Sequence, residues 1–273
     1  PRYLQGGFTS PDNQYAPYPY DNRYDDIYET STIDSVWEDV ALLRESVLWG
    51  QREPYNKFLP VNPNTGNPYP VGCVNVALSQ IMAYYKYPEK YDWKLMTKLV
   101  NIENNPFATL AMEDSIATFI KELTVMSKTT FYPSTDDAGT RIENCMHALD
   151  TCNYTYNQPI YYNSNAVRKS LKAKKFVIAF GESYFGAGHA FVLSGYWKFT
   201  TPQSMKDKGL EDGTNLGVNW GNAGGWGDGW YLVEYGDKDI TKLGLAKIDP
   251  YTGEYSTDYS YNMVLLTGIS PKR

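Results

Sequence analysis

The stretch GCVNVALSQIMAYYKYP, residues 72–88, carries the strongest helix signal in the sequence. Its apolar side chains recur every three or four residues, and this spacing predicts a core helix that begins at Gly72-Cys73 and ends at Tyr87-Pro88. The apolar face consists of Val74, Ala77, Leu78, Ile81, Met82 and Tyr85. Cys73 lies at the N-terminal edge, where unpaired backbone N–H groups and the helix dipole favour a thiolate. The helix therefore presents a candidate nucleophile at its start.

The remaining sequence divides into a helical first half and a β-rich second half. Apolar spacing predicts further helices over 35–48 and around 116–123, 142–149 and 167–171. After Lys175, short β-rich runs between Gly, Asp and Asn turns predict strands at 176–180, 189–196, 217–220, 229–235 and 261–268. Helices first and antiparallel strands later predict an α+β fold of two subdomains with a cleft between them.

Residues 1–45 are predicted to form an extended arm, and residues 46–273 the main domain. The arm is rich in Tyr, Asp, Asn and Pro and has little apolar periodicity, so it cannot bury much surface by itself. We expect it to pack near the cleft, because Tyr-rich segments can fill an aromatic cleft. The chain begins at Pro1, which a removed export signal would explain and simple trimming would explain equally.

Composition excludes several classes of function. The 273 residues carry 25 Lys and Arg against 31 Asp and Glu, a net charge of −6, without a basic cluster. This argues against nucleic acid or an anionic membrane as a partner. No run of about 18 apolar residues predicts a membrane span. The three cysteines, Cys73, Cys145 and Cys152, are an odd number, so at least one thiol is free.

Only two histidines are available to carry the proton of a thiol nucleophile. His189 follows glycines at the start of a β-rich run, and glycines there allow close backbone approach at a cleft edge. His147 lies within a predicted helix without such surroundings. The sequence therefore favours His189 as the catalytic base.

Two further segments complete a candidate active site. Asn219 and Trp220 end a strand before a glycine-rich turn, where the amide could orient the imidazole and the indole could shield that hydrogen bond from water. Gln51, upstream of Cys73, could donate to an oxyanion. The residues predicted to contact substrate are Ala187, Gly188 and Trp226.

Together these segments resemble the streptopain family of secreted bacterial cysteine peptidases, in the papain clan. The matching segments are residues 51–56, 72–77, 80–88, 188–192, 218–221 and 261–269. The resemblance implies a papain-like two-part fold, a helical subdomain carrying the nucleophile and a twisted antiparallel sheet carrying the histidine. It makes residues 46–273 a catalytic domain that binds extended polypeptides in the cleft.

By position, the resemblance makes Cys73 the nucleophile, His189 the general base and then acid, and Gln51 the oxyanion donor. Either Asn219 or Trp220 would orient the histidine. The reaction implied is peptide hydrolysis by a cysteine endopeptidase through a thioester acyl-enzyme. The resemblance also implies an exported zymogen that is secreted, periplasmic or at the cell surface. Its expected partner is a propeptide or an inhibitor protein, and the arm could be a propeptide remnant.

The sequence departs from the family pattern near the nucleophile and after the tryptophan. Asn75 stands where the family has a small residue and is expected to alter the cleft floor. Ser194 replaces an acid, and the turn after Trp220 contains Asn222-Ala223 and a second Trp-Gly pair. We expect these changes to affect substrate preference, and the many aromatic residues favour a hydrophobic or aromatic substrate side chain next to the scissile bond.

Other functions remain open on sequence alone. A transglutaminase-like acyltransferase would need an Asp where Asn219-Trp220 stands. A catalytically inactive peptidase fold could bind peptide or glycan at the cell surface, since fold does not fix activity and 15% of the residues are aromatic. No metal or cofactor is expected, because the histidines lie far apart and no phosphate-binding loop occurs. A monomer is expected, and whether Cys145 and Cys152 pair is left open.

Overall fold

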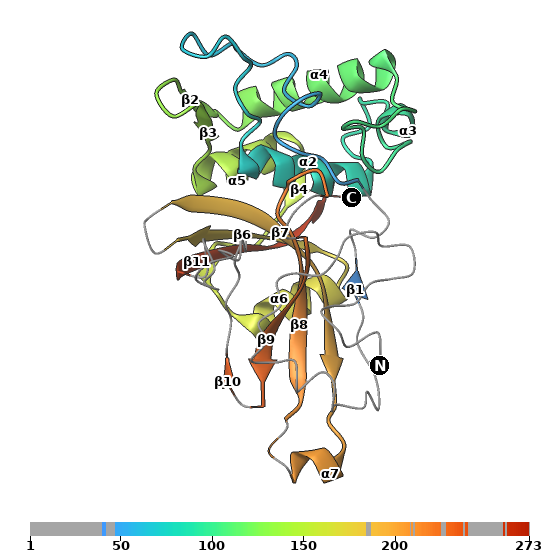
Figure 1. Cartoon of the computed structure of the whole chain (residues 1–273), viewed down its shortest axis with the longest axis vertical. Helices are drawn as coiled ribbons and strands as arrows, with labels where there is room; N and C mark the ends of the chain where they lie inside the picture. The colour runs from blue at the N-terminus through green and yellow to red at the C-terminus, as the bar shows by residue number, and fades with distance from the viewer. Residues whose placement is uncertain are drawn as a thin grey trace, which may run out of the picture.

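A computed structural model describes residues 40–41, 47–183, 187–207, 209, 211–224, 228–236, 238–239, 259 and 261–272. Helices α2 to α5 gather at one end of the molecule, and the sheet occupies the middle and the other end (Figure 1). This is the α+β arrangement that the sequence predicts. No helix in the described ranges is long and apolar enough to cross a membrane.

Helix α2 (Cys73–Tyr85) is the central helix of the fold. It begins after Gly72, whose φ of 83° favours glycine and whose Cβ, if present, would lie 3.0 Å from the carbonyl oxygen of Ala138. It ends at Lys86, which takes the left-handed conformation typical of a helix C-terminus. Ten of its residues are buried, from Val74 to Ala83. The prediction of a core helix is therefore confirmed.

The other predicted helices after residue 100 are also present, each with somewhat different ends. They are α4 (Leu110–Met126), α5 (Ile142–Thr151) and α6 (Ser164–Lys172). The side chains of Thr109 and Asn163 accept hydrogen bonds from the first turns of α4 and α6, which explains where these two helices start. Two short helices were not predicted, α3 (Trp93–Met96) and α7 (Gln203–Lys206).

A nine-stranded antiparallel sheet forms the second part of the fold. Its long strands are β6 (Phe176–Glu182), β7 (Gly188–Phe199), β8 (Gly213–Asn219), β9 (Gly229–Tyr235) and β11 (Tyr261–Pro271). The short ones are β1 (Val40–Ala41), β4 (Tyr154–Thr155), β5 (Ile160–Tyr161) and β10 (Lys238–Asp239). The order β10-β9-β8-β7-β6-β11-β4 places the last strand beside β6, and β1 and β5 pair with β7 and β11. The five predicted strand regions are confirmed.

The predicted helix over 35–48 is wrong where the structure describes it. Val40 and Ala41 form β1, which pairs antiparallel with Tyr196 and Gly195 of β7. Backbone pairing with an existing strand here outweighs the apolar spacing, which is a weak local signal. Residues 1–39 lie outside the described residues, so the arm, its boundary at residue 45 and its packing near the cleft stay predictions.

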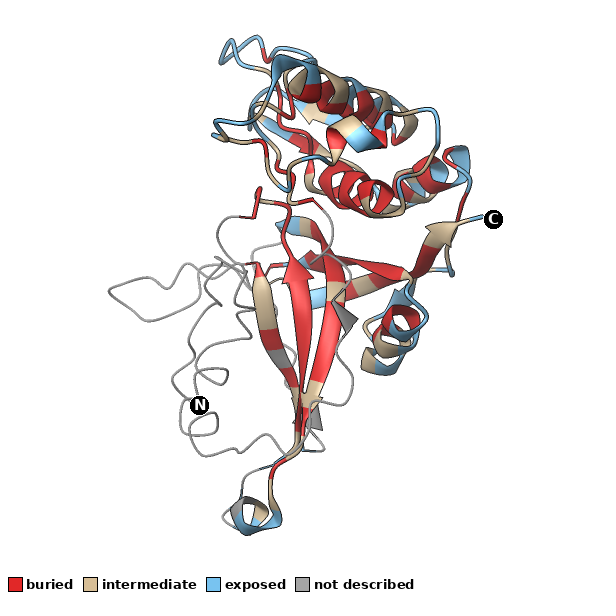
Figure 2. Cartoon of the chain, turned by 90° about the vertical axis from the view of Figure 1, so that its right-hand side faces the viewer, coloured by how far each residue is buried: buried red, intermediate tan, exposed pale blue. Residues whose placement is uncertain are grey.

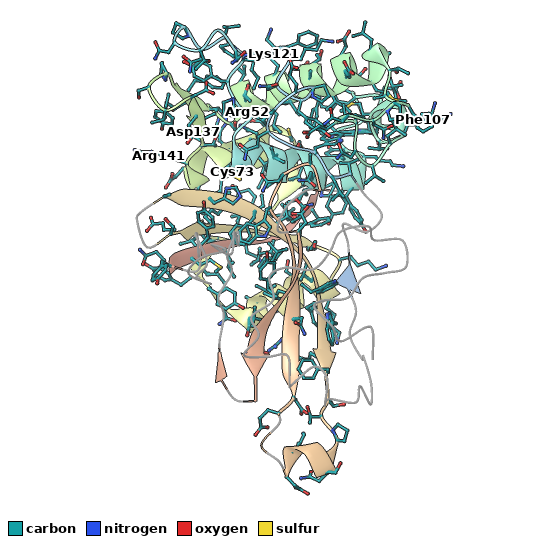
Figure 3. All side chains as sticks on the ribbon, viewed as in Figure 1. Arg52, Cys73, Phe107, Lys121, Asp137 and Arg141 are labelled. Atoms are coloured by element: carbon teal, nitrogen blue, oxygen red, sulfur yellow. The ribbon has the colours of Figure 1, made fainter. Side chains whose placement is uncertain are left out.

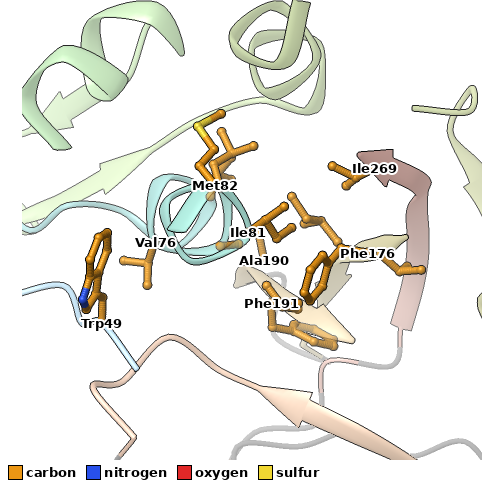
Figure 4. Close-up of a cluster of buried hydrophobic side chains, with 14 of the residues drawn as sticks. Trp49, Val76, Ile81, Met82, Phe176, Ala190, Phe191 and Ile269 are labelled. Carbon is orange, nitrogen blue, oxygen red and sulfur yellow. The ribbon is translucent and has the colours of Figure 1, made fainter. Parts of the chain in front are cut away.

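The core lies between α2 and the sheet. Tyr84 and Tyr85 at the end of α2 pack edge-to-face on Phe176 of β6, with ring centroids 4.9 and 5.7 Å apart. Figure 4 shows Phe176 in one apolar cluster with Ile81 of α2 and Ile269 of β11. Buried residues run continuously from the inner helix faces into the strands (Figure 2). The two parts are therefore joined by a shared apolar core.

A small hairpin, β2 (Thr130–Tyr132) with β3 (Asp137–Gly139), lies beside the start of α2. Asn75 connects α2 to this region: its amide donates to the Val71 carbonyl and to Thr129 Oγ1, and its Oδ1 accepts from Ser127 at 2.6 Å. Thr129 in turn bonds Thr140, beyond β3. Asn75 is fully buried in this network. Its polar atoms therefore tie the start of α2 to the segment before β2, and the expectation that it alters the cleft floor stays a prediction.

Candidate active site

Cys73, the first residue of α2, meets the sheet at β7. Its Sγ accepts a hydrogen bond from the backbone N–H of Ala190 at 3.3 Å. Because Ala190 directly follows His189, the helix-borne sulfur lies beside the strand position that carries the histidine. Figure 3 shows Cys73 at the junction of the helical part and the sheet. The structure thus brings together two residues that are 116 positions apart in the chain.

The surroundings of Cys73 favour the neutral thiol. Burial is the largest effect and raises the pKa of Cys73, while the N–H groups of Ala190 and Val74 lower it in part. The expectation of a thiolate stabilised at the helix start stays a prediction, because the backbone N–H groups that favour it are opposed by burial. Cys145 and Cys152 are buried free thiols with pKa values raised by burial, so they do not form a disulfide.

His189 is held by one hydrogen bond and by aromatic rings. Its Nε2 lies 3.1 Å from the main-chain carbonyl oxygen of Trp220. The imidazole stacks on the rings of Phe191 and Trp220, with centroids 6.1 and 5.8 Å away, and Tyr259 lies 5.2 Å away. Burial lowers the pKa of His189 to about 4, although the Trp220 carbonyl acts in the opposite direction. The imidazole is therefore neutral near pH 7.

Asn219 does not contact the imidazole directly. Its Oδ1 accepts from the backbone N–H of Gly221 at 2.9 Å and from Nε2 of Gln80 at 3.0 Å. The amide and the imidazole instead bind opposite ends of one peptide unit, which contains the Trp220 carbonyl and the Gly221 N–H. Of the two candidate orienting residues, Trp220 makes the contact with His189, through its main chain.

Gln51, Ala187 and Gly188 lie next to segments of this centre. The Gln51 carbonyl accepts from the N–H of Val71 at 2.9 Å, which brings residue 51 beside the turn before Cys73. Ala187 and Gly188 lead into His189, and a Cβ added at Gly188 would meet open space. Trp226 lies outside the described residues. The roles of all four in oxyanion or substrate binding stay predictions.

Two residues of this region were missed by sequence reasoning. Gln80 lies two helical turns after Cys73 on α2 and is fully buried. Asp228 lies at the start of β9, and its Oδ1 accepts from the backbone N–H of Trp220 at 2.6 Å. The spacing of seven residues from Cys73 was a readable signal for Gln80, because residues seven apart share a helix face. Nothing in the glycine-rich turn marks Asp228 as a buried acid.

The buried carboxyl of Asp228 leads to a prediction about stability. Burial raises its pKa to about 7, against an ordinary value near 3.9. Between these two values the folded chain holds a proton that the unfolded chain releases, so the free energy of unfolding falls as pH rises, by up to about 1.4 kcal/mol per pH unit.

Urea unfolding of the wild type and Asp228→Asn at pH 5 and pH 7.5 measures this effect. We expect the wild type to lose stability relative to the variant at the higher pH. An equal difference at both pH values would show that Asp228 is not protonated in the folded chain.

A cysteine at a helix start beside a histidine on an antiparallel sheet is the arrangement of papain-like cysteine peptidases. The sequence matches the profile of the peptidase C10 family over residues 49–91 and 89–231. The chain belongs to this family, which is the streptopain-like family of the papain clan.

Comparisons with individual proteins agree with this assignment. The chain is 24% identical to the thiol protease/hemagglutinin PrtT of Porphyromonas gingivalis over 279 residues, which cover 88% of this chain and 28% of PrtT. The chain therefore spans about a quarter of the length of that relative. Its fold resembles active interpain A, a cysteine protease of Prevotella intermedia, with a TM-score of 0.58 at 21% identity over 85% of this chain and 94% of that one.

A prointerpain A fragment from the same organism, with a Cys→Ala mutation, has a TM-score of 0.59 at 19% identity. It matches over 98% of this chain and 94% of its own. These two likenesses concern the fold alone, and the papain-like fold class is confirmed by them.

Proposed function

We propose that this chain is a cysteine endopeptidase that hydrolyses peptide bonds of extended polypeptides through a thioester acyl-enzyme. The observation that carries the proposal is the contact of Cys73 Sγ with the N–H that follows His189, together with the bond from His189 Nε2 to the Trp220 carbonyl. Membership of a family whose relatives are cysteine proteases supports the same reaction.

The Trp220 carbonyl determines which nitrogen of His189 can act as the base. A carbonyl oxygen only accepts hydrogen bonds, so the neutral imidazole carries its proton on Nε2. Nδ1 is then the basic nitrogen. Because burial disfavours both the thiolate and the imidazolium, the thiol proton moves to Nδ1 as the sulfur attacks the substrate carbonyl.

The two chemical steps follow from this assignment. In acylation, Cys73 Sγ bonds to the scissile carbon, the C–N bond breaks, and His189 gives the thiol proton to the departing amine. In deacylation, water attacks the thioester, its proton passes to Nδ1, the C–S bond breaks and the proton returns to sulfur. Gln51 and backbone N–H groups at the start of α2 are proposed to stabilise the oxyanion.

The family resemblance extends the proposal beyond the chemistry. We propose an exported enzyme made as a zymogen, with polypeptides as substrates and a propeptide as its inhibitory partner. The similarity to a prointerpain A fragment supports the zymogen. Ala187, Gly188 and Trp226 are the proposed substrate-contacting residues.

The test is covalent labelling with a peptidyl epoxide that alkylates cysteine-peptidase thiols, followed by intact mass and peptide mapping. We expect a single adduct, on Cys73, and none in the Cys73→Ala variant. Cys145 and Cys152 are internal controls, since both are buried. If neither the folded chain nor a form that begins near Ser35 is labelled or hydrolyses unfolded protein substrates, the proposal is replaced by an inactive fold that binds peptide or glycan.

A further inference from the structure

Trp220 lies between two peptide units, and a side chain holds each of them. The N–H of the preceding unit donates to Asp228 Oδ1 at 2.6 Å. The N–H of the following unit, on Gly221, donates to Asn219 Oδ1 at 2.9 Å, and this oxygen also accepts from Gln80 Nε2 at 3.0 Å. The Trp220 carbonyl that contacts His189 belongs to the second unit. Hydrogen bonds to the N–H groups before and after Trp220 thus fix the direction of this carbonyl.

Close packing makes this arrangement rigid. Gly221 has a φ of 77°, and an added Cβ would lie 2.9 Å from Val76 Cγ1 and 4.0 Å from Gln80 Nε2. The face of α2 that carries Val76 and Gln80 therefore packs against the turn that contains the Trp220 carbonyl. The indole Nε1 of Trp220 donates to the Tyr231 hydroxyl at 3.0 Å, so its side chain is held as well.

Burial of the polar side chains of Gln80 and Asp228 lowers the stability of this core. Gln80 is fully buried, and its Oε1 has no hydrogen-bond partner among the described residues. Asp228 is 8% exposed, and within the same part of the chain its Oδ2 also has none. A buried polar atom without a partner destabilises a fold, and an apolar side chain of similar size would avoid that cost. A purely structural role explains these two residues poorly.

We propose that Gln80 and Asp228 are positioning residues that aim the Trp220 carbonyl at His189 and so fix the orientation and tautomer of the catalytic imidazole. The proposal rests on the proposed peptidase function. Neither side chain touches the sulfur or the imidazole in the contacts described above. Asp228 acts through the Trp220 N–H, and Gln80 acts through Asn219, which binds the Gly221 N–H. Gln80 adds a link between the helix that carries Cys73 and the turn that holds His189.

The test compares Gln80→Leu, Asp228→Ala and Asp228→Asn with the wild type and a matched control, Ser170→Ala. Ser170 is buried and makes hydrogen bonds to Lys175, Phe176 and Gly268, so its loss also removes polar contacts from the fold. It lies on α6, and its hydrogen bonds reach β6 and β11, which carry none of the proposed catalytic residues. It therefore reports the effect of destabilisation alone.

The first readout is the ring N–H resonance of His189 in NMR spectra of full-length protein labelled at histidine. With only two histidines in the chain, His147 is the internal reference. We expect Gln80→Leu and Asp228→Ala to weaken or shift the Nε2–H signal of His189 and to leave that of His147 unchanged. Asp228→Asn keeps an acceptor oxygen and is expected to preserve the wild-type signal, as is Ser170→Ala.

The second readout is steady-state kinetics on a peptide substrate. We expect kcat to fall about 10- to 100-fold in Gln80→Leu and Asp228→Ala, since a misplaced catalytic group slows the chemical step. KM is expected to stay within about twofold of the wild type. Spectra and kcat that match Ser170→Ala would overturn the proposal. A wild type without hydrolysis would refute the peptidase function, whereas the His189 resonance would still decide the positioning role.

Discussion

The His189→Ala variant is expected to hydrolyse peptides roughly 100- to 10,000-fold more slowly than the wild type. The reason is the state of the thiol: its surroundings raise the pKa of Cys73, so the sulfur depends on a neighbouring base at neutral pH. The imidazole belongs to the residue before Ala190, whose N–H contacts this sulfur, and its Nε2 is fixed on the Trp220 carbonyl at 3.1 Å. Initial rates on a quenched fluorescent peptide, with protein folding checked by circular dichroism, measure the effect.

His147→Ala is the matched control for this experiment. His147 lies on α5, and its Nδ1 is 3.0 Å from the main-chain carbonyl oxygen of Met126, so its contacts belong to the helical part. We expect this variant to keep the wild-type rate. A His189→Ala variant that is folded and as active as the control would exclude general base catalysis by His189.

The Phe176→Ala variant is expected to lose about 3–5 kcal/mol in the free energy of unfolding. Phe176 is fully buried where the helical part meets the sheet. Its ring contacts two tyrosines at the end of α2, and its backbone pairs with Ile269 of β11. Removing the ring leaves a cavity that rigid strands on one side and a buried helix on the other cannot fill. Urea unfolding at constant pH measures the loss.

Phe107→Ala removes the same ring from an exposed position. Phe107 is 77% exposed, so its loss is expected to change stability by no more than about 0.5 kcal/mol. A Phe176→Ala variant no less stable than this control would mean that the helical part and the sheet are not joined through Phe176.

The sequence predicted the helices and strands where local signals are strong. The apolar face of residues 72–85 and the turn residues at both ends agree with α2 because one local rule governs spacing and termini. The order of the strands in the sheet could not be predicted from such local signals. That β11 lies beside β6, and that Val40 pairs with Tyr196, depends on contacts between distant segments, for which a single sequence holds no periodic signal.

The sequence predicted the parts of the candidate site that depend on residue type. It did not predict the contacts that main-chain atoms make. Cysteine and histidine are recognisable because few residues can act as nucleophile or base, and the structure brings Cys73 and His189 together. The contact that holds the imidazole is a main-chain carbonyl, which every residue possesses. Which of Asn219 and Trp220 contacts His189 could therefore be seen only in the structure. Asp228 escaped notice for a similar reason, because its partner is a backbone N–H.

The position of β11 has a consequence for the order in which the molecule is built. This strand is the last in sequence, yet it lies inside the sheet between β6 and the short strands β4 and β5. The Tyr85 hydroxyl at the end of α2 reaches the main-chain carbonyl of Ile269 in the same strand. During synthesis, the sheet beneath α2 stays incomplete until residue 271 has left the ribosome. The architecture thus ties completion of the sheet, and of its contact with the end of α2, to the emergence of the last strand.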